Sequence, residues 1–364
     1  GKRRATEAAS AEVQASEAEL RDVLVTLLAD VALAYLDVRV YQARLASAEA
    51  SLANQLEALD LARWRAQAGL VTQLDVEQAQ YAADQTRAQM PVLRSGLQQS
   101  LHRVAVLLGQ TPGSVQQQLA TAAPIPAAPD SLLVGVPASA LQQRPDVRQA
   151  ERLLAAQTAQ VGVATAALYP SLNLNGSIGV QALSAGDLFD SGSGISTLAG
   201  QLAQPLFNAG KLRRAVDVQE ERLQQAHLAY RSTVLGALEE TENALVSYVN
   251  EHQHRDALRS ATESAARASE LARQQYQSGL VDFQTVLTTQ RSWLLLQDEL
   301  NQSNGEIVAN TIRLYKALGG RPGCPPLDAA PIWFMPFSCP FSSDPRSGVA
   351  VCLRPTRWTA PSLR

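Results

Sequence analysis

The body of this chain has few of the residues that cross-link or fill a compact globular core. Its three cysteines, Cys324, Cys339 and Cys352, all lie near its end, and their spacing matches no zinc or redox motif. Aromatic residues make up only 5% of the sequence. Alanine, leucine, glutamine and glutamate dominate long stretches instead, which favours helices packed side by side. No hydrophobic run approaches the roughly 20 residues of a membrane-spanning helix.

The sequence also lacks the features of an enzyme or of a nucleic-acid-binding protein. Its formal net charge is -3, and its lysines and arginines are spread evenly rather than gathered into a basic surface. No combination of histidine, cysteine and acid sets up a nucleophile, and no glycine-rich phosphate loop follows a strand. His252 and His254 are two residues apart on an expected helix, so they face different sides. We therefore expect no enzymatic activity, no metal, no cofactor and no nucleic-acid partner.

A heptad pattern predicts one long helix over residues 18–68. Its two seams are mostly apolar or small, which is typical of a coiled coil. The seams comprise Leu24, Val31, Val38, Leu45, Leu52 and Leu59 on one side and Leu20, Leu27, Ala34, Tyr41, Ala48 and Gln55 on the other. The pattern breaks at Gly69, and a second helix is expected over 73–108, so that the two form an antiparallel hairpin. Taken alone, the pattern is most often that of an ordinary coiled coil.

The period changes from helical to alternating after Tyr169 and Pro170. Apolar residues then alternate with small polar ones; the apolar positions are Leu172, Leu174, Ile178 and Val180. Such a stretch of about 9–11 residues is typical of a strand in an outer-membrane protein, although a half-buried soluble strand shows the same pattern. A second extended stretch is expected over 196–207, with Pro205 near its end.

The chain is expected to divide into four regions. They are a first helical hairpin (1–110), a proline-rich linker (111–144), a second repeat (145–320) and a tail (321–364). The second repeat contains a helix (145–168), a strand hairpin (170–208) with a loop at 181–195, and a long helical hairpin (213–318). The tail has no helical or strand period and contains half of the 18 prolines. We therefore expect it to be disordered or non-native.

The two helical hairpins are related by an internal repeat. A shift of 210 residues places Leu61-Ala62-Arg63 on Leu271-Ala272-Arg273 and Gly69-Leu70-Val71 on Gly279-Leu280-Val281 without a gap. Self-similarity at a fixed period indicates duplicated structure. With the shift reduced by one residue, Gly1-Lys2 falls on Gly210-Lys211, which closes the strand hairpin of the second repeat. This predicts that a first strand pair precedes residue 1.

Several motifs, taken in order, resemble the TolC and NodT-type outer-membrane factor family. The resemblance covers residues 1–320. Its carriers are residues 141–147 (LQQRPDV), 164–172 (ATAALYPSL), 204–210 (QPLFNAG) and 315–320 (YKALGG), together with the two Gly-Leu-Val turns. Each motif is weak by itself, but the set in this order is specific to the family.

The resemblance implies a mainly α fold and a passive transport function. Long antiparallel coiled-coil hairpins would form a trimeric periplasmic α-barrel, and the strand hairpin would contribute to an outer-membrane β-barrel. The chain would then be a subunit of the exit duct of a tripartite efflux system for drugs or other small molecules. Its partners would be two further copies, a periplasmic adaptor, an inner-membrane pump and outer-membrane lipid. The Arg144-Pro145-Asp146 motif resembles the drug-efflux branch more than the type I secretion branch.

The resemblance also assigns roles to residues at the two helical turns. Gly69, Leu70 and Val71, with Gly279, Leu280 and Val281, match the tips that dock adaptor hairpins. Asp75 and Tyr276 match an acid and a tyrosine that hydrogen-bond in the closed gate. Where the family often has a constricting aspartate, this chain has Thr288, so Asp282 is the substitute candidate. By themselves, Asp75 would be a solvated helix residue and Tyr276 a packing residue.

Two rival classes fit part of the same pattern. A periplasmic adaptor has one helical hairpin flanked by β-domains, whereas this chain has two related hairpins. A structural coiled-coil protein outside any membrane would explain the heptads, but not the alternating segment or the proline-rich linker. Dependence on detergent would separate a duct from both rivals.

Overall fold

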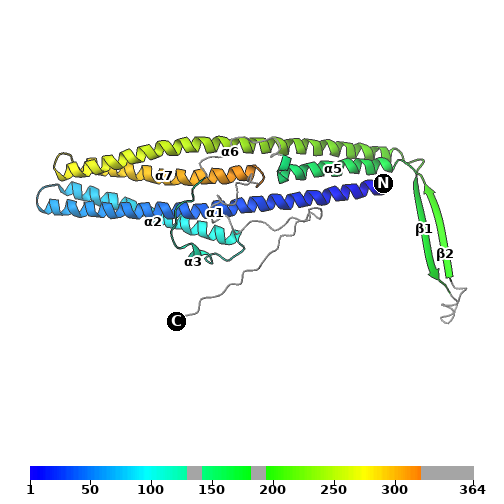
Figure 1. The fold of residues 1–364 in the computed structure, drawn as a ribbon, viewed down its shortest axis with the longest axis horizontal. Helices are drawn as coiled ribbons and strands as arrows, with labels where there is room; N and C mark the ends of the chain where they lie inside the picture. Colours follow the sequence, from blue (N-terminus) through cyan, green and yellow to red (C-terminus); the bar gives the residue numbers. More distant parts are fainter. Residues whose placement is uncertain (129–141, 182–193, 321–364) are drawn as a thin grey trace, which may run out of the picture. The chain divides into compact units, whose positions relative to one another are not determined.

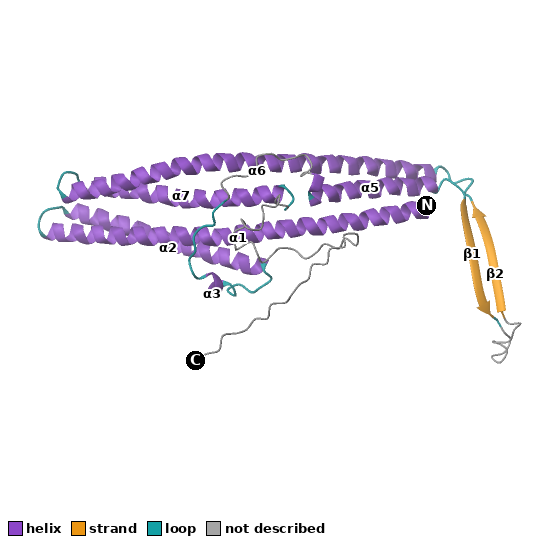
Figure 2. Ribbon diagram, in the orientation of Figure 1, coloured by secondary structure: helices purple, strands orange, loops and turns teal. Residues whose placement is uncertain are grey.

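The computed structural model describes residues 1–128, 142–181 and 194–320, and these residues are mainly helical, as the sequence predicts. Two very long helices, three shorter partner helices and one strand pair make up most of this part (Figures 1 and 2). In chain order the elements are α1 (Lys2–Gln67), α2 (Gln73–Leu107), α3 (Gln116–Leu119), α5 (Pro145–Ala166), β1 (Ser171–Val180), β2 (Gly194–Ala203), α6 (Lys211–Gln277) and α7 (Phe283–Ala317). The expected tail at 321–364 and most of the expected loop at 181–195 lie outside the described residues.

The helices pair as two antiparallel hairpins joined along α1. The helix α1 packs against α2, and α6 packs against α7. In addition, α1 lies against both α5 and α7, and α5 lies against α6. Figure 1 shows α5 and α7 following one another along α6, so that α1 and α6 each span both partners. None of the described helices has a segment that is long and apolar enough to cross a membrane.

The first helix begins much earlier than its heptad pattern predicts. It starts at Lys2 rather than near residue 18. The added turns bury small side chains at helical spacing, namely Ala8, Ala11, Ala15 and Ala18. Alanine has the highest helix propensity and lets a neighbouring helix approach closely. The heptad pattern of large apolar residues does not extend to these alanines, and for this reason the predicted start of α1 was wrong.

The predicted seam of α1 is buried only along its later part. Ala34, Val38, Ala48, Gln55 and Leu59 are buried against neighbouring helices. In contrast, Leu20, Leu24 and Leu27 are 60%, 47% and 39% exposed. The heptads predict helical contact correctly, but at these three leucines the contact is not made within one chain.

The two strands form an antiparallel hairpin whose faces differ in polarity. Leu172 lies opposite Leu202, and Ser177 lies opposite Thr197, where the two hydroxyl oxygens are 2.6 Å apart. The first strand has the predicted bounds, but the second runs over Gly194–Ala203 instead of 196–207. It ends before Pro205, because proline has no N–H to donate to a strand ladder.

Small residues and paired polar groups hold α1 against α7. Gly305 lies so close to α1 that a Cβ at this position would overlap Val40 Cγ2. Nearby, the Arg44 guanidinium donates from Nε and Nη2 to the two Asp298 carboxylate oxygens, at 2.7 and 2.9 Å. The glycine permits the close approach, and the bidentate ion pair fixes the register of the two helices.

Replacing Gly305 with alanine should therefore destabilise the protein. The new methyl group overpacks against the stiff Val40 side chain, and overpacking costs about 1–3 kcal/mol. Gly236→Ala is the matched control, because Gly236 lies within α6 and a Cβ added there would meet open space. The control should gain about 0.5–1 kcal/mol from helix propensity. Thermal unfolding followed by circular dichroism measures both, and equal effects of the two variants would contradict the close contact.

Candidate functional site

The two helical turns have the same backbone geometry and form the candidate site. Gly69 and Gly279 adopt left-handed conformations, with φ of 73° and 75°. The amide of Gly69 donates to Ala66 O at 3.0 Å and that of Leu70 to Arg65 O at 2.9 Å, and the second turn repeats both bonds. This pattern is the Schellman motif, which ends a helix and is usually built on glycine. The structure therefore places both predicted glycines at chain reversals.

The leucine and valine that follow each glycine face different environments. Leu70 and Leu280 are each 74% exposed, which makes them the most outward apolar side chains of the turns. Val71 and Val281 are half-buried and pack against the core of the tips. An apolar contact at these turns is therefore offered by the leucines, whereas the valines serve the fold.

A shared hydrophobic core joins the ends of the two hairpins. It draws on all four long helices: its buried members are Leu59, Ala62, Val76, Ala79, Ala272, Tyr276, Phe283 and Val286. We call this set the tip core. Because both hairpins contribute to it, they cannot separate at this end without exposing apolar surface.

The two predicted acids cap the second helix of each hairpin, with exchanged roles. In the first turn the amide and hydroxyl of Thr72 both donate to the Asp75 carboxylate at 2.9 Å. In the second turn Asp282 accepts from the amide of Thr285 at 2.9 Å and from its hydroxyl. The 210-residue shift places Thr72 on Asp282 and Asp75 on Thr285. Each turn therefore contains one threonine–aspartate hydrogen-bonded pair, and the order of the two residues along the chain is reversed between the turns.

Hydrogen bonding stabilises the ionised form of Asp282. The Thr285 hydroxyl, followed by its amide, lowers the pKa of this carboxyl below its ordinary value. A lowered pKa in the folded state means that the capping contribution is fully present above the ordinary carboxyl range and is lost as the pH falls through the lowered value. The start of α7 is therefore held in place at neutral pH.

Tyr276 does not meet Asp75 in this structure. Its side chain lies in the tip core with 6% exposure, and its hydroxyl has no hydrogen-bond partner among the described residues. The Oδ2 atom of Asp75 instead accepts from the amide and the hydroxyl of Thr72. The expected bond between the two is thus absent here, and the ring of Tyr276 makes the contacts: Phe283 lies 5.2 Å away, centroid to centroid.

Arg65 is a tip residue that the sequence did not indicate. It lies in the last turn of α1, and its guanidinium carbon is 4.5 Å from the centre of the Tyr276 ring. Its Nη1 and Nη2 donate to Tyr276 O and Gln277 O, each at 3.2 Å. A basic residue in a last turn is a weak signal, and nothing in the sequence points to acceptors on another hairpin.

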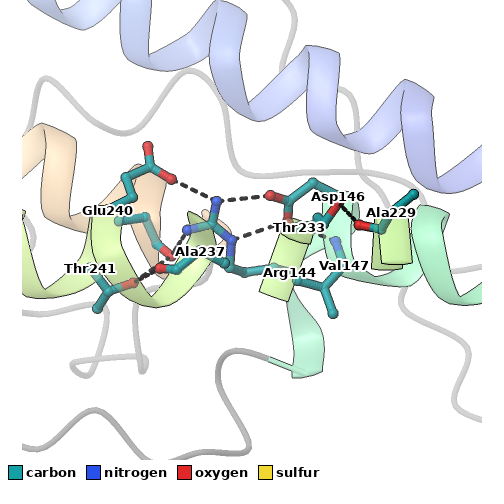
Figure 3. A network of polar contacts seen from close by, with 9 residues as sticks. Arg144, Asp146, Val147, Ala229, Thr233, Ala237, Glu240 and Thr241 are labelled. Carbon is teal, nitrogen blue, oxygen red and sulfur yellow. Dashed lines mark hydrogen bonds and ion pairs between the residues drawn. The ribbon is translucent and has the colours of Figure 1, made fainter. Parts of the chain in front are cut away.

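A buried arginine, Arg144, joins three helices away from the tips (Figure 3). Arg144, only 7% exposed, precedes α5 and donates to Ala317 O at the end of α7, at 2.6 Å. It also donates to Asp146 at 3.0 and 2.9 Å and to Glu240 of α6 at 2.6 Å. Burial disfavours its charge, but the hydrogen bonds and charges of the two carboxylates outweigh burial and raise the pKa of Arg144.

Two further features of the described residues bear on what the protein could bind. No group of three or more potential metal ligands occurs among them. A groove of about 780 Å³ runs between α1, α6 and α7 and is lined by acids, amides and a few cations. It is open to solvent, and most of the residues that line it are polar.

Together, the duplicated hairpins, their glycine turns and the strand pair define a class: helical subunits that present two similar tips at one end. A family model of outer membrane efflux proteins matches residues 1–110 and 136–320. The chain therefore belongs to the outer membrane efflux protein family, which confirms the resemblance noted in the sequence.

Similar proteins of known name agree with this assignment. Nodulation protein T of Rhizobium leguminosarum bv. trifolii is 34% identical over 320 residues, covering 87% of this chain and 67% of the relative. The solvent efflux pump outer membrane protein SrpC of Pseudomonas putida is 33% identical over 312 residues, covering 84% and 65%. The chain thus spans about two thirds of the length of these relatives.

Solved structures share the fold. The outer-membrane channel OprN superposes with a TM-score of 0.81 at 33% identity, covering 88% of this chain and 72% of that channel. The outer membrane protein VceC of Vibrio cholerae superposes with a TM-score of 0.78 at 28% identity, covering 87% and 75%. The mainly helical fold class predicted from the sequence is therefore confirmed.

Loss of the Arg144 side-chain contacts with Asp146, Glu240 and Ala317 should destabilise the packing of α5, α6 and α7. Arg144→Met removes one donor each from Asp146, Glu240 and Ala317 O. Breaking a largely buried ion pair costs about 3–5 kcal/mol, and partial exposure of Glu240 reduces this to about 2–3 kcal/mol. The control is Arg148→Met, because Arg148 is exposed one turn later. Denaturant unfolding should separate the two variants, and a cost below about 0.5 kcal/mol for Arg144→Met would contradict a structural role.

Proposed function

We propose that this protein is the outer-membrane channel subunit of a tripartite efflux system, a passive exit path for small molecules. The observation that carries the proposal is the superposition on OprN, an outer-membrane channel, over 88% of this chain. Named relatives include a solvent efflux pump outer membrane protein and a pyoverdine export outer membrane protein of Pseudomonas putida. These names support small molecules as the exported class.

Assembly into a homotrimer is supported by apolar side chains that one chain leaves uncovered. They include Leu20, Leu24 and Leu27 on α1 and Leu228, Leu235 and Val246 on α6, all at least 39% exposed. These residues lie on the two longest helices and extend over several turns. Exposed apolar surface on this scale marks an interaction site, and further copies of the same chain would bury it.

The tips are the proposed docking points for a periplasmic adaptor, which would link the channel to an inner-membrane pump. Gly69 and Gly279 make the reversals, and the exposed Leu70 and Leu280 offer one apolar side chain per tip. A helical hairpin of a partner can take such side chains into the groove between its helices. Val71 and Val281 support the docking points from behind by anchoring each turn to the tip core.

We further propose that Asp75, Tyr276 and Asp282 belong to the periplasmic gate. All three lie at the tips, and Tyr276 keeps a buried hydroxyl without a partner among the described residues. An unpaired buried hydroxyl costs free energy that a change of tip arrangement can recover. Thr72 occupies only Oδ2 of Asp75, so Oδ1 would accept from Tyr276 once a change of the tips brought the two side chains together.

Membrane fractionation with native mass measurement tests the proposed function. The chain, expressed with a signal peptide in a Gram-negative host, should enter the outer-membrane fraction, give a trimeric mass in detergent and conduct ions in planar bilayers. The Arg148→Met variant serves as a control for expression and folding. A monomeric product that remains in the periplasm without detergent would contradict the channel assignment and favour the adaptor class.

Replacing Leu70 and Leu280 with serine should weaken adaptor docking. Each change removes one exposed apolar contact, worth about 1.5–3 kcal/mol if the partner buries it fully, so cross-linking to an adaptor should fall at least tenfold. Leu295→Ser, on α7, is the control for loss of an exposed leucine elsewhere, because Leu295 is 53% exposed. Undiminished cross-linking of the double variant, with trimers intact, would remove the docking role from these leucines.

A further inference from the structure

The contacts of Arg65 point to a function that rests on the proposed channel assembly but goes beyond it. We propose that Arg65 is a clamp that locks the two helical tips of one subunit together, and that the junctions between subunits have no such clamp. Opening of the channel would then separate neighbouring subunits more readily than the two tips of one subunit. The geometry of the tips and the asymmetry of the repeat carry this inference.

One side chain makes three contacts across the two hairpins. From the end of α1, the Arg65 guanidinium stacks over the Tyr276 ring and donates to two carbonyl oxygens in the last turn of α6. Helix carbonyls in a last turn lack intrahelical donors and carry partial negative charge, so a cation is favoured there. The stacked ring adds a cation–π attraction.

The hydrogen bonds of Arg65 are directional, whereas the hydrophobic contacts of the tip core are not. Apolar burial in the tip core holds the hairpins together but tolerates sliding, because hydrophobic contact is not directional. Hydrogen bonds from a planar guanidinium fix both distance and orientation. Arg65 therefore sets the register of the two tips through its contacts with the ring and the carbonyl oxygen of the buried Tyr276.

The internal repeat shows that the clamp occurs once. The 210-residue shift places Arg65 on Gln275 and Tyr276 on Ala66. In a ring where first and second hairpins alternate, a junction between subunits would pair the second hairpin of one copy with the first hairpin of the next. At the equivalent positions that junction has a glutamine and an alanine, with neither a cation nor a ring.

The clamp also separates two possible roles of Tyr276. Arg65 uses the ring and the backbone carbonyl of Tyr276 but not its hydroxyl. Tyr276→Phe therefore keeps the clamp and removes only a bond of the hydroxyl to Asp75, whereas Arg65→Gln removes the clamp and keeps the hydroxyl. The two variants assign the closing contact to one or the other.

Spin labels on the exposed tip residues measure the clamp in the chain itself. The three cysteines at 324, 339 and 352 are first replaced by serine; Leu70 and Leu280 are then replaced by cysteine and labelled. Co-assembly with excess unlabelled chain leaves one labelled copy per assembly, so that only distances within a subunit are recorded. Double electron–electron resonance then measures the distance distribution between the two labels, which gives the ratio of molecules with separated tips to molecules with joined tips.

Arg65→Gln, which installs the residue found at the equivalent position of the second repeat, should raise that ratio about tenfold, as expected from losing a stacked, charge-assisted contact. Tyr276→Phe should leave it unchanged, and Arg65→Lys should give an intermediate value because lysine keeps the charge without the planar fork. The control is Arg63→Gln, since the hydrogen bonds of Arg63 within the described part of the chain go to Asp60 and Gln80 of its own hairpin.

Unchanged distances in Arg65→Gln would overturn the clamp. A larger effect of Tyr276→Phe than of Arg65→Gln would overturn it as well, and would assign the closing contact to the Tyr276 hydroxyl. Ion conductance of the unsubstituted chain is recorded in parallel: its absence contradicts the proposed channel, whereas the distances within a subunit still report on Arg65. The two failures are therefore distinguishable.

Discussion

Close approach of helices through small side chains is the constraint on which the whole structure depends. The first helix must contact three neighbours along its length, and it can do so only where alanine or glycine lets a backbone come near. Gly162 of α5 lies close to Arg4 of α1, and Gly305 of α7 lies close to Val40. Large side chains at these positions would hold the helices apart and leave each of the long helices without a continuous partner.

Arginine side chains then fix the register of neighbouring helices, which apolar packing alone does not determine. Arg44 pairs with Asp298 between α1 and α7, Arg144 joins the start of α5 to the end of α7, and Arg65 reaches from one tip to the other. Two of the three donate to carbonyl oxygens at a helix end, where the helix itself has no further N–H groups to offer. The guanidinium is suited to this task because it remains charged and holds several donors in one plane.

The sequence predicts most elements because their signals are local. Glycine at 69 and 279 ends a helix by its own backbone freedom, and alternation from Leu172 to Val180 reveals a strand without knowledge of its partner. The alanine seam before residue 18 was missed because alanine is only weakly apolar, and the end of β2 was misplaced because Pro205 overrides the pattern around it. The contacts of Arg65 with α6, and those of Arg144 with Glu240 and Ala317, depend on atoms far along the chain, so no local pattern could identify them.

The exchanged caps at the two turns limit how such a repeat can diverge. Thr72 with Asp75, and Asp282 with Thr285, make the same bond from opposite assignments. If a duplicated turn exchanges only threonine and aspartate, one residue at a time, it passes through two acids or through two threonines at these positions. Two acids repel one another, whereas two threonines retain a weaker cap. The turn with two threonines is therefore the more stable intermediate, and the two positions are expected to change together.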